Sequence, residues 1–224
     1  IDIPDFTLPA DGSSTVNCAA DAVAPTPPVM QDACGNTITP VPGTAPSPLT
    51  CEGDMVYTFT YTDCASNTHV WTYTYTIDIP DFVLPADGAS TVNCAANATP
   101  PTPPVMQDAC GNTITPVAGT TPSPLTCDGD MVYTFTYSDC AGNSHVWTYT
   151  YTIDIPDFTL PADGSSTVNC AVDAVAPTPP VMQDACGNTI TPVAGTTPSP
   201  LTCEGDMVYT FTYSDCAGNS HVWT

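Results

Sequence analysis

The fold is decided by two neighbouring stretches of sequence, Met55-Val-Tyr-Thr-Phe-Thr-Tyr-Thr62 and His69-Val-Trp-Thr-Tyr-Thr-Tyr-Thr-Ile77. Both alternate large apolar side chains with threonine, which is the pattern of a β-strand with one buried face. The segment between them, at residues 63–67, has the composition of a turn. We therefore predict a β-hairpin whose threonines face solvent and whose aromatic side chains point into a core, namely Tyr57, Phe59, Tyr61, Trp71, Tyr73 and Tyr75.

Shorter β-type segments precede the hairpin and are separated by Pro, Gly and Asp. They lie at residues 6–8, 14–17, 28–31, 37–39 and 48–50. The 26 prolines of the chain leave no room for a helix of useful length. About seven short strands, with turns every 8–12 residues or so, predict an all-β chain of tandem immunoglobulin-like β-sandwich domains.

The whole pattern occurs three times. The segment Ile1-Asp-Ile-Pro-Asp-Phe6 returns at residues 77–82 and again at 153–158. Repetition at a fixed period indicates one structural unit per copy. We predict three domains, at residues 1–76, 77–152 and 153–224, the last of them truncated within its final strand. The truncation suggests a window on a longer array.

The charge of the chain is one-sided, with 23 Asp and Glu, three His and no Lys or Arg, giving a net charge of −23. Without cationic side chains nothing can neutralise a phosphate backbone, so nucleic acid is excluded as a partner. The chain also has no cationic patch that could bind anionic lipid head groups. No apolar run is long enough for membrane insertion. Since no basic group and no convergent polar set would stabilise developing negative charge, we predict that the protein is not an enzyme.

Each repeat carries four cysteines at fixed positions. An even number per repeat predicts two disulfides per repeat and an extracellular or cell-surface location. Zinc is disfavoured, because the spacing contains no Cys-x-x-Cys and each repeat has a single histidine. A unit of this size is close to the limit at which a core alone suffices, so the bridges should be essential to folding. The cysteines are Cys18, Cys34, Cys51, Cys64, Cys94, Cys110, Cys127, Cys140, Cys170, Cys186, Cys203 and Cys216.

Two motifs of the repeat resemble those of a known family. They are Ala24-Pro-Thr-Pro-Pro-Val-Met-Gln-Asp-Ala-Cys-Gly-Asn36 and Tyr57-Thr-Phe-Thr-Tyr-Thr-Asp-Cys-Ala-Ser-Asn67. Together they resemble HYR and HYR-like repeats, whose Asp-x-Ala-Gly-Asn turn is matched more closely at residues 139–143 and 215–219. The four-cysteine form is similar to tandem repeats in very long secreted surface proteins of Bacteroidetes-type bacteria. The resemblance implies an immunoglobulin-like sandwich in an extracellular stalk or adhesin, often exported by type IX secretion, and it brings no catalytic residue.

The implied fold also suggests a pairing of the cysteines. In such a sandwich the second and sixth strands, bracketed by Cys18 and Cys34 and by Cys51 and Cys64, run in the same direction. Their starts should therefore meet, as should their ends. We expect the disulfides Cys18–Cys51 and Cys34–Cys64 in the first repeat, and their equivalents in the others, Cys94–Cys127, Cys110–Cys140, Cys170–Cys203 and Cys186–Cys216.

The joints between repeats contain no flexible linker. The last strand of one repeat runs through Ile77 towards Pro80 without any glycine or serine, which predicts a stiff, straight connection. Carboxylates at these joints suit a hard cation, although two side chains fall short of the six to eight oxygens that calcium takes. The candidate Ca²⁺ ligands are Asp78, Asp81, Asp154 and Asp157, and the alternative is solvated surface charge.

The threonine rows allow three interpretations. Threonine favours exposed strand positions, which explains the rows without any further role. The second is O-linked glycosylation at Thr58, Thr60, Thr72 and Thr74, and the third is an ice-binding surface. The single histidine of each repeat, at His69, His145 and His221, is interpreted as a packed or half-exposed strand residue and not as a catalytic base.

Two functions compete on these grounds. The first is a structural repeat segment of an extracellular fibre or surface stalk, stiffened by disulfides and linker-free joints. Exposed sheet edges without guarding lysines would favour self-association into a filament or array. The alternative is an adhesin that recognises a glycan or a host surface protein through its loops. The aromatic residues lie in strands and the loops are small, which favours the structural function.

Overall fold

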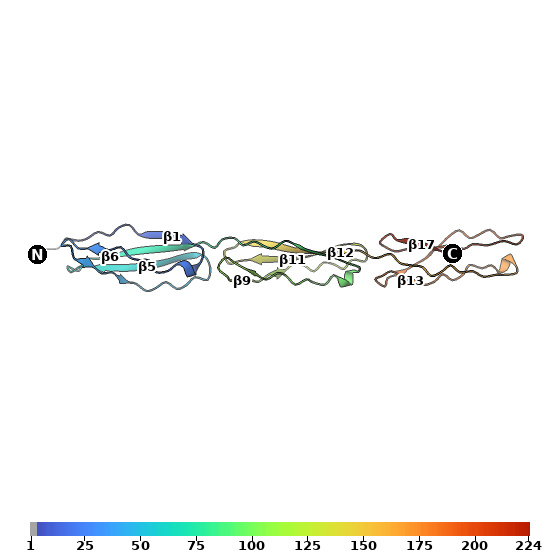
Figure 1. The fold of residues 1–224 in the computed structure, drawn as a ribbon, viewed down its shortest axis with the longest axis horizontal. Helices are drawn as coiled ribbons and strands as arrows, with labels where there is room; N and C mark the ends of the chain where they lie inside the picture. Colours follow the sequence, from blue (N-terminus) through green and yellow to red (C-terminus); the bar gives the residue numbers. More distant parts are fainter. Residues whose placement is uncertain (1–3) are drawn as a thin grey trace. The chain divides into compact units, whose positions relative to one another are not determined.

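The computed structural model describes residues 4–224 and has the predicted all-β fold, with tandem β-sandwich repeats (Figure 1). The predicted first domain begins at Ile1, which lies outside the described residues. The helical elements of the described chain are three single turns, η1 (Ala19–Asp21), η2 (Ala95–Asn97) and η3 (Ala171–Asp173). No helix in residues 4–224 has the length and hydropathy of a membrane span.

The first repeat combines a four-stranded sheet, in the order β1-β6-β5-β4, with the two-stranded sheet β2-β3. Its long strands β5 and β6 are the predicted hairpin and lie side by side in Figure 1, antiparallel, with Phe59 opposite Trp71. On the other side of β6, β1 pairs in parallel, from Gly12 opposite Tyr73 to Val16 opposite Ile77. The six strands are β1 (Gly12–Val16), β2 (Met30–Gln31), β3 (Thr37–Ile38), β4 (Val41–Pro42), β5 (Gly53–Thr62) and β6 (Thr68–Ile77).

The second repeat has the same sheets, β10-β11-β12-β7 and β8-β9, and the third has β15-β16-β17 and β13-β14. The third repeat lacks the parallel strand because β17 stops at Trp223, before the positions with which that strand would pair. The strands are β7 (Gly88–Val92), β8 (Met106–Gln107), β9 (Thr113–Ile114), β10 (Val117–Ala118), β11 (Gly129–Ser138), β12 (Ser144–Ile153), β13 (Met182–Gln183), β14 (Thr189–Ile190), β15 (Val193–Ala194), β16 (Phe211–Ser214) and β17 (Ser220–Trp223).

Two of the predicted short strands are wrong and one strand was not predicted. Residues 6–8 and 48–50 are irregular, although the Phe6 side chain is buried in the core. The additional strand is β4, which contains Pro42. Because β4 lies at the edge of its sheet, its proline removes no hydrogen bond between strands. The first repeat therefore has six strands where about seven were expected.

The core of the first repeat lies between its two sheets. Phe6, Ile38, Phe59, Tyr61 and Trp71 form one buried cluster. Tyr61 is completely buried, and its hydroxyl donates a hydrogen bond to the Pro28 carbonyl oxygen at 2.7 Å, so its polar end is satisfied. Burial raises the pKa of Tyr61. The inward-facing aromatic row of the sequence pattern is thus confirmed for the centre of the hairpin, with Tyr57 and Tyr73 partly buried beside it.

The threonine face is less open than predicted. Thr58, Thr60, Thr72 and Thr74 are half-buried, and only the terminal positions such as Thr62 and Thr76 are exposed. Neighbouring strands explain the difference, because β4 lies beside β5 and β1 lies beside β6 in the same sheet, so that the threonines have residues next to them on these flanks.

By its contacts the chain divides into two compact units. One comprises Ile1–Pro85, Pro103–Val117 and Thr136–Trp147, and the other comprises Ala86–Thr102, Ala118–Phe135 and Thr148–Thr224. Each unit therefore combines one end repeat with a part of the middle repeat. The domain boundaries at residues 76 and 152 stay a prediction.

Candidate functional site at the repeat joints

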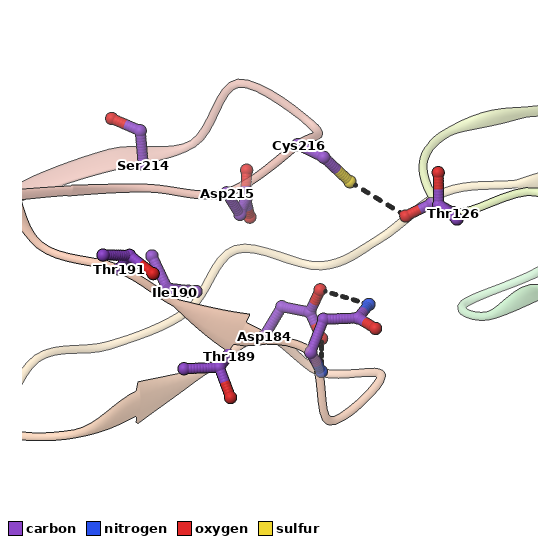
Figure 2. Close-up of a pocket in the computed structure, with 9 residues that line it drawn as sticks. Thr126, Asp184, Thr189, Ile190, Thr191, Ser214, Asp215 and Cys216 are labelled. Atoms are coloured by element: carbon purple, nitrogen blue, oxygen red, sulfur yellow. Dashed lines mark hydrogen bonds between the residues drawn. The ribbon is translucent and has the colours of Figure 1, made fainter.

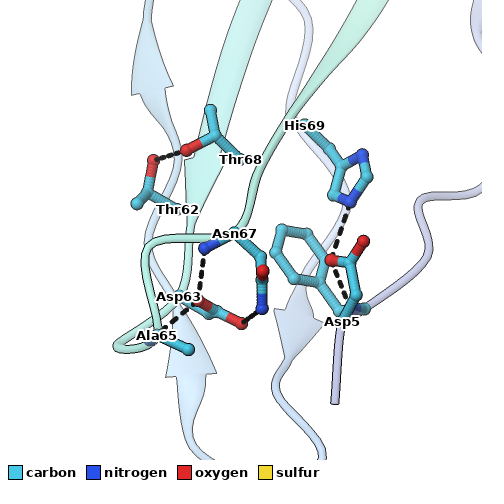
Figure 3. Close-up of polar contacts among 8 residues, drawn as sticks. Asp5, Thr62, Asp63, Ala65, Asn67, Thr68 and His69 are labelled. Atoms are coloured by element: carbon cyan, nitrogen blue, oxygen red, sulfur yellow. Dashed lines mark hydrogen bonds and ion pairs between the residues drawn. The ribbon is translucent and has the colours of Figure 1, made fainter. Parts of the chain in front are cut away.

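Two loops of each repeat are built around an aspartate and an asparagine four residues later. In the first repeat Asp63 Oδ1 accepts hydrogen bonds from the backbone N–H groups of Ala65 and Asn67, at 2.9 and 2.8 Å (Figure 3). Its other oxygen accepts one from the Asn67 side chain at 2.8 Å. Asp32 holds residues 32–36 in the same way through Cys34 and Asn36. Residues 63–67 were predicted as a turn and residues 32–36 were not, and each of these loops also holds one cysteine.

The cysteines fall into two groups by their place in the repeat. We call those in the aspartate loops the loop cysteines: Cys34 and Cys64, Cys110 and Cys140, and Cys186 and Cys216. The others precede either a single helical turn or the first strand of the hairpin, as Cys18 precedes η1 and Cys51 precedes β5. We call these the forward cysteines: Cys18 and Cys51, Cys94 and Cys127, and Cys170 and Cys203.

Disulfides join the forward cysteines of one repeat to the loop cysteines of the next. Cys18 is bonded to Cys110 and Cys51 to Cys140, with Cα–Cα distances of 5.6 and 5.7 Å. All four residues belong to the same compact unit. The bonds close loops with sequence separations of 92 and 89 residues, worth about 4–5 kcal/mol each in the chain-entropy model.

The predicted pairing within each repeat is therefore wrong. It assumed that two cysteines at the same end of a sandwich bond to one another. Cys18 and Cys51 do line one groove, but each meets a loop of the following repeat instead of its neighbour. The pairings Cys18–Cys51, Cys34–Cys64, Cys94–Cys127, Cys110–Cys140, Cys170–Cys203 and Cys186–Cys216 are replaced by Cys18–Cys110, Cys51–Cys140, Cys94–Cys186 and Cys127–Cys216.

A small apolar core lies beneath these two bonds. Ala22, Met55, Ile77 and Ile79 are buried together, and we call them the joint cluster. Cys110 and Ala141 of the second repeat pack against it. The backbone is fixed there as well, because the Ile79 N–H donates to the Glu52 carboxylate at 3.1 Å. The joint therefore combines backbone continuity, two disulfides and buried apolar contact.

The second joint repeats this arrangement within the other compact unit. Cys94 is bonded to Cys186 and Cys127 to Cys216, with Cα–Cα distances of 5.6 and 5.5 Å. Figure 2 shows the Cys216 side chain reaching from its loop to Thr126, whose carbonyl oxygen is 3.2 Å from the sulfur. The apolar residues beneath are the equivalents of the joint cluster, Ala98, Met131, Ile153 and Ile155.

A family model for a HYR-like domain with four cysteines matches residues 6–77, 82–153 and 158–224. The chain belongs to this HYR-like family. No curated protein matches it. HYR-like repeats are a non-catalytic type of domain, and tandem repeats of this kind with disulfides are structural or adhesion-type modules of the cell exterior or surface. All four cysteines of the second repeat make the joints, whereas Cys34, Cys64, Cys170 and Cys203 are free in the described chain.

The acidic candidates at the joints do not gather into a recognisable metal site among residues 4–224, where no group of three or more His, Cys, Asp or Glu side chains is placed to hold an ion. Asp81 instead lies against His145, with Oδ1 2.8 Å from Nε2, and Asp157 lies against His221 in the same way. His69 contacts Asp5 at 2.9 Å (Figure 3). Calcium binding through Asp78, Asp81, Asp154 and Asp157 stays a prediction.

The histidine of each HYR-like repeat contacts a phenylalanine ring and an aspartate. The His69 ring meets the Phe6 ring edge-on, with centroids 4.8 Å apart, and its Nε2 faces Asp5. His69 is a residue of strand β6, as predicted, and its carboxylate partner Asp5 lies 64 positions away in the sequence. O-linked glycosylation of the threonine rows stays a prediction, and the half-burial of those residues reduces their access.

Proposed function

We propose that this chain is a structural segment of an extracellular fibre or surface stalk, in which disulfides carry tension from each HYR-like repeat to the next. One observation carries the proposal. The forward cysteines of the first and second repeats are bonded to the loop cysteines of the second and third. The resemblance to secreted surface proteins of Bacteroidetes-type bacteria agrees with such a role.

The connectivity gives tension a short covalent route through each repeat. Force enters the middle repeat through the Cys51–Cys140 bond and leaves it through the Cys127–Cys216 bond. Between these bonds it crosses only the backbone from Cys140 back to Cys127. That backbone is about 13 residues long and spans about 45 Å when fully extended. A ten-residue strand such as β11 already spans about 33 Å, so pulling lengthens the repeat little before covalent bonds bear the load.

Stiffness has a second source in the joint itself. Residues 77–80 connect two repeats without glycine or serine, and Ile77 and Ile79 are both buried in the joint cluster. A joint held by a proline-containing backbone, two disulfides and buried side chains has few soft torsions. Low compliance and small extension are the properties that a stalk or fibre requires.

The test is single-molecule stretching of the chain between its termini. In the oxidised protein the shortest covalent route crosses residues 1–18, 110–127 and 216–224, which limits the extension to about 150 Å. After reduction the whole backbone is released, and the limit rises to about 780 Å.

A matched variant supplies an intermediate value. Replacing Cys127→Ser and Cys216→Ser removes one bridge and moves the shortest route to the Cys94–Cys186 bond, with a limit of about 250 Å. The proposal fails if the oxidised wild-type chain extends as far as the reduced one, because the repeats would then unravel singly under load.

A further inference from the structure

The four-stranded sheet of the first repeat has one face that is turned away from the core. Because Phe59 and Trp71 are buried in the core, the residues that alternate with them along the strands point outward. We call this surface the outer face. It consists of the even-numbered residues 56–62 of β5 and 68–76 of β6, with Val41 of β4 and with Ser13 and Thr15 of β1. All of them are valine, threonine or serine.

The valines of the outer face belong to one continuous surface. Val41 is paired with Thr60, and Thr60 with Val70, so these three form a row across β4, β5 and β6. Val56 is paired with Thr74 in a second row. Val41 and Val70 expose 65% and 53% of their surface. Single exposed valines are ordinary, but a contiguous uncharged patch of methyl groups marks a site of interaction.

The second repeat shows that this exposure does not depend on the ends of the chain. It is bonded to a repeat on each side, and its outer face is still open. Its Val117, Val132 and Val146 are the equivalents of Val41, Val56 and Val70, and they expose 69%, 43% and 55% of their surface. The outer face is therefore a property of a repeat that has both neighbours.

Carboxylates border the outer face without entering its centre. Among residues 4–76, Asp54 is the one acidic residue within a strand, and the others lie in loops or in η1. Asp54 is paired with Thr76 at one end of the face and accepts its hydroxyl at 2.9 Å. Asp11 lies just before β1, where it accepts the Thr72 N–H at 2.8 Å. A second copy that approaches through the loops meets like charge, and the chain has no Lys or Arg to offset it.

The edges of the sheet are poorer places for a second copy than its face. The edge strand β4 has two residues, and one of them is Pro42, which has no N–H to donate. The other edge strand, β1, has five residues. Short strands and proline are the features with which natural sheets prevent pairing along an edge. The uncharged outer face is free of this obstacle.

The size of the outer face sets how many repeats must take part. Strands of ten residues, four abreast, give a face about 33 Å long and about 15 Å wide, or about 500 Å². A stable interface buries about 800 Å² on each partner. One face alone falls short of this area, whereas the faces of two repeats reach it. Each further repeat then strengthens the association through avidity.

We propose that the outer faces of two copies of this chain pack against one another, so that chains associate side by side. A second copy is the occupant because it brings an uncharged methyl surface of the same kind and size in every complete repeat, and because the rest of its surface is acidic. The inference goes beyond the proposed function, which concerns the covalent route within one chain. Stretching of a single molecule does not depend on it.

The experiment places three carboxylates on the outer faces of the full chain and compares them with three placed elsewhere. The face variant changes valines that are 53–55% exposed, namely Val70→Glu, Val146→Glu and Val222→Glu. The control variant adds the same charge at valines outside the face that are 83–87% exposed, namely Val29→Glu, Val105→Glu and Val181→Glu. A third form carries glutamine at the three face positions, which removes apolar surface without adding charge.

Sedimentation equilibrium measures the self-association of each form at about 0.15 M and about 1 M salt, because salt screens the repulsion between chains of charge −23. The exposed thiols are first capped with iodoacetamide, so that only non-covalent association is measured. Peptide mapping of the four disulfides and thermal unfolding check that every form is folded.

We expect the wild type to associate, and to do so more tightly at the higher salt concentration. The face variant should raise the dissociation constant about ten-fold or more, the glutamine form by a smaller factor, and the control variant by less than about two-fold. A wild type that stays monomeric up to about 1 mM, or a control variant as weak as the face variant, would overturn the proposal. Thermal hysteresis that the face variant loses, without self-association of the wild type, would assign the outer face to ice instead.

Discussion

Ser66 is the one non-glycine residue in the described chain with a left-handed backbone, at φ 70°. It occupies the turn between β5 and β6, directly after the loop cysteine Cys64 and Ala65. The same position in the other repeats is Gly142 and Gly218, both at φ 94°. A side chain in this region meets the backbone and costs energy that glycine avoids, so the first repeat carries a local strain that its copies lack.

We predict that Ser66→Gly stabilises the protein and that Gly142→Ser destabilises it. The expected change is about 0.5–1 kcal/mol in each direction, because relief of strain is partly offset by the greater freedom of glycine in the unfolded chain. Urea unfolding of the oxidised proteins measures both. Equal stability of Ser66→Gly and the wild type would contradict the assignment of strain.

The loop aspartates make the stability of the folded chain depend on pH. Hydrogen bonds from the Asn36 side chain, and then from its backbone N–H, hold the pKa of Asp32 below its ordinary value of 3.8. A carboxyl group with a lower pKa in the folded chain releases protons more readily there than in the unfolded chain. Its contribution is therefore complete above about pH 4 and is lost as the pH falls through the folded value.

We predict that acid weakens the wild type more than it weakens Asp32→Asn. Protonation also relieves the self-repulsion of the acidic chain, and the comparison cancels that effect since it acts on both proteins. Thermal unfolding is measured for both proteins between about pH 5 and pH 2. We expect the difference in melting temperature between the wild type and Asp32→Asn to become smaller as the pH falls. A difference that is constant across this range would show that the Asp32 carboxylate is not held in its charged form.

Among the elements, the edge strand β4 depends on a single glycine. The Gly43 N–H donates to the Thr58 carbonyl oxygen at 2.8 Å, directly after β4 ends. A Cβ at position 43 would collide with the Thr58 hydroxyl, and the same holds for Gly119 with Thr134 and Gly195 with Thr210. The close approach of β4 to β5 requires that position 43 carry no side chain.

We predict that Gly43→Ala destabilises the first repeat by about 1–3 kcal/mol through this collision. Because the nearest atom is the threonine hydroxyl, Thr58→Ala should restore much of the loss when both changes are combined. A double-mutant cycle in urea measures the coupling. Additive effects of the two substitutions would exclude the collision as the cause.

The hairpin was predictable because its signal is local. Alternation of aromatic residues and threonine placed the strands at 55–62 and 69–77, and the structure extends them to Gly53–Thr62 and Thr68–Ile77. The strand β4 gave no such signal, since a two-residue strand with a proline has neither alternation nor high β-propensity. Its existence follows from contact with β5, which sequence pattern alone does not contain.

The connections across the whole chain were the hardest part to predict. The even cysteine count indicated disulfides correctly, but their pairing depends on which surfaces meet. A partial signal was present, because Cys51 and Cys64 stand before and after a strand of ten residues, at its opposite ends. Combined with a joint that has no slack, that placement brings the forward end of one repeat to the loops of the next.

The order of the four disulfides along the chain has a consequence for damage. Each bond spans a stretch that the following bond overlaps, from Cys18–Cys110 through Cys51–Cys140 and Cys94–Cys186 to Cys127–Cys216. Every peptide bond between Cys18 and Cys216 is therefore bypassed by at least one disulfide. A single hydrolytic cut anywhere in that interval leaves one covalent molecule, so the protein can be nicked by a protease and still hold its two ends together.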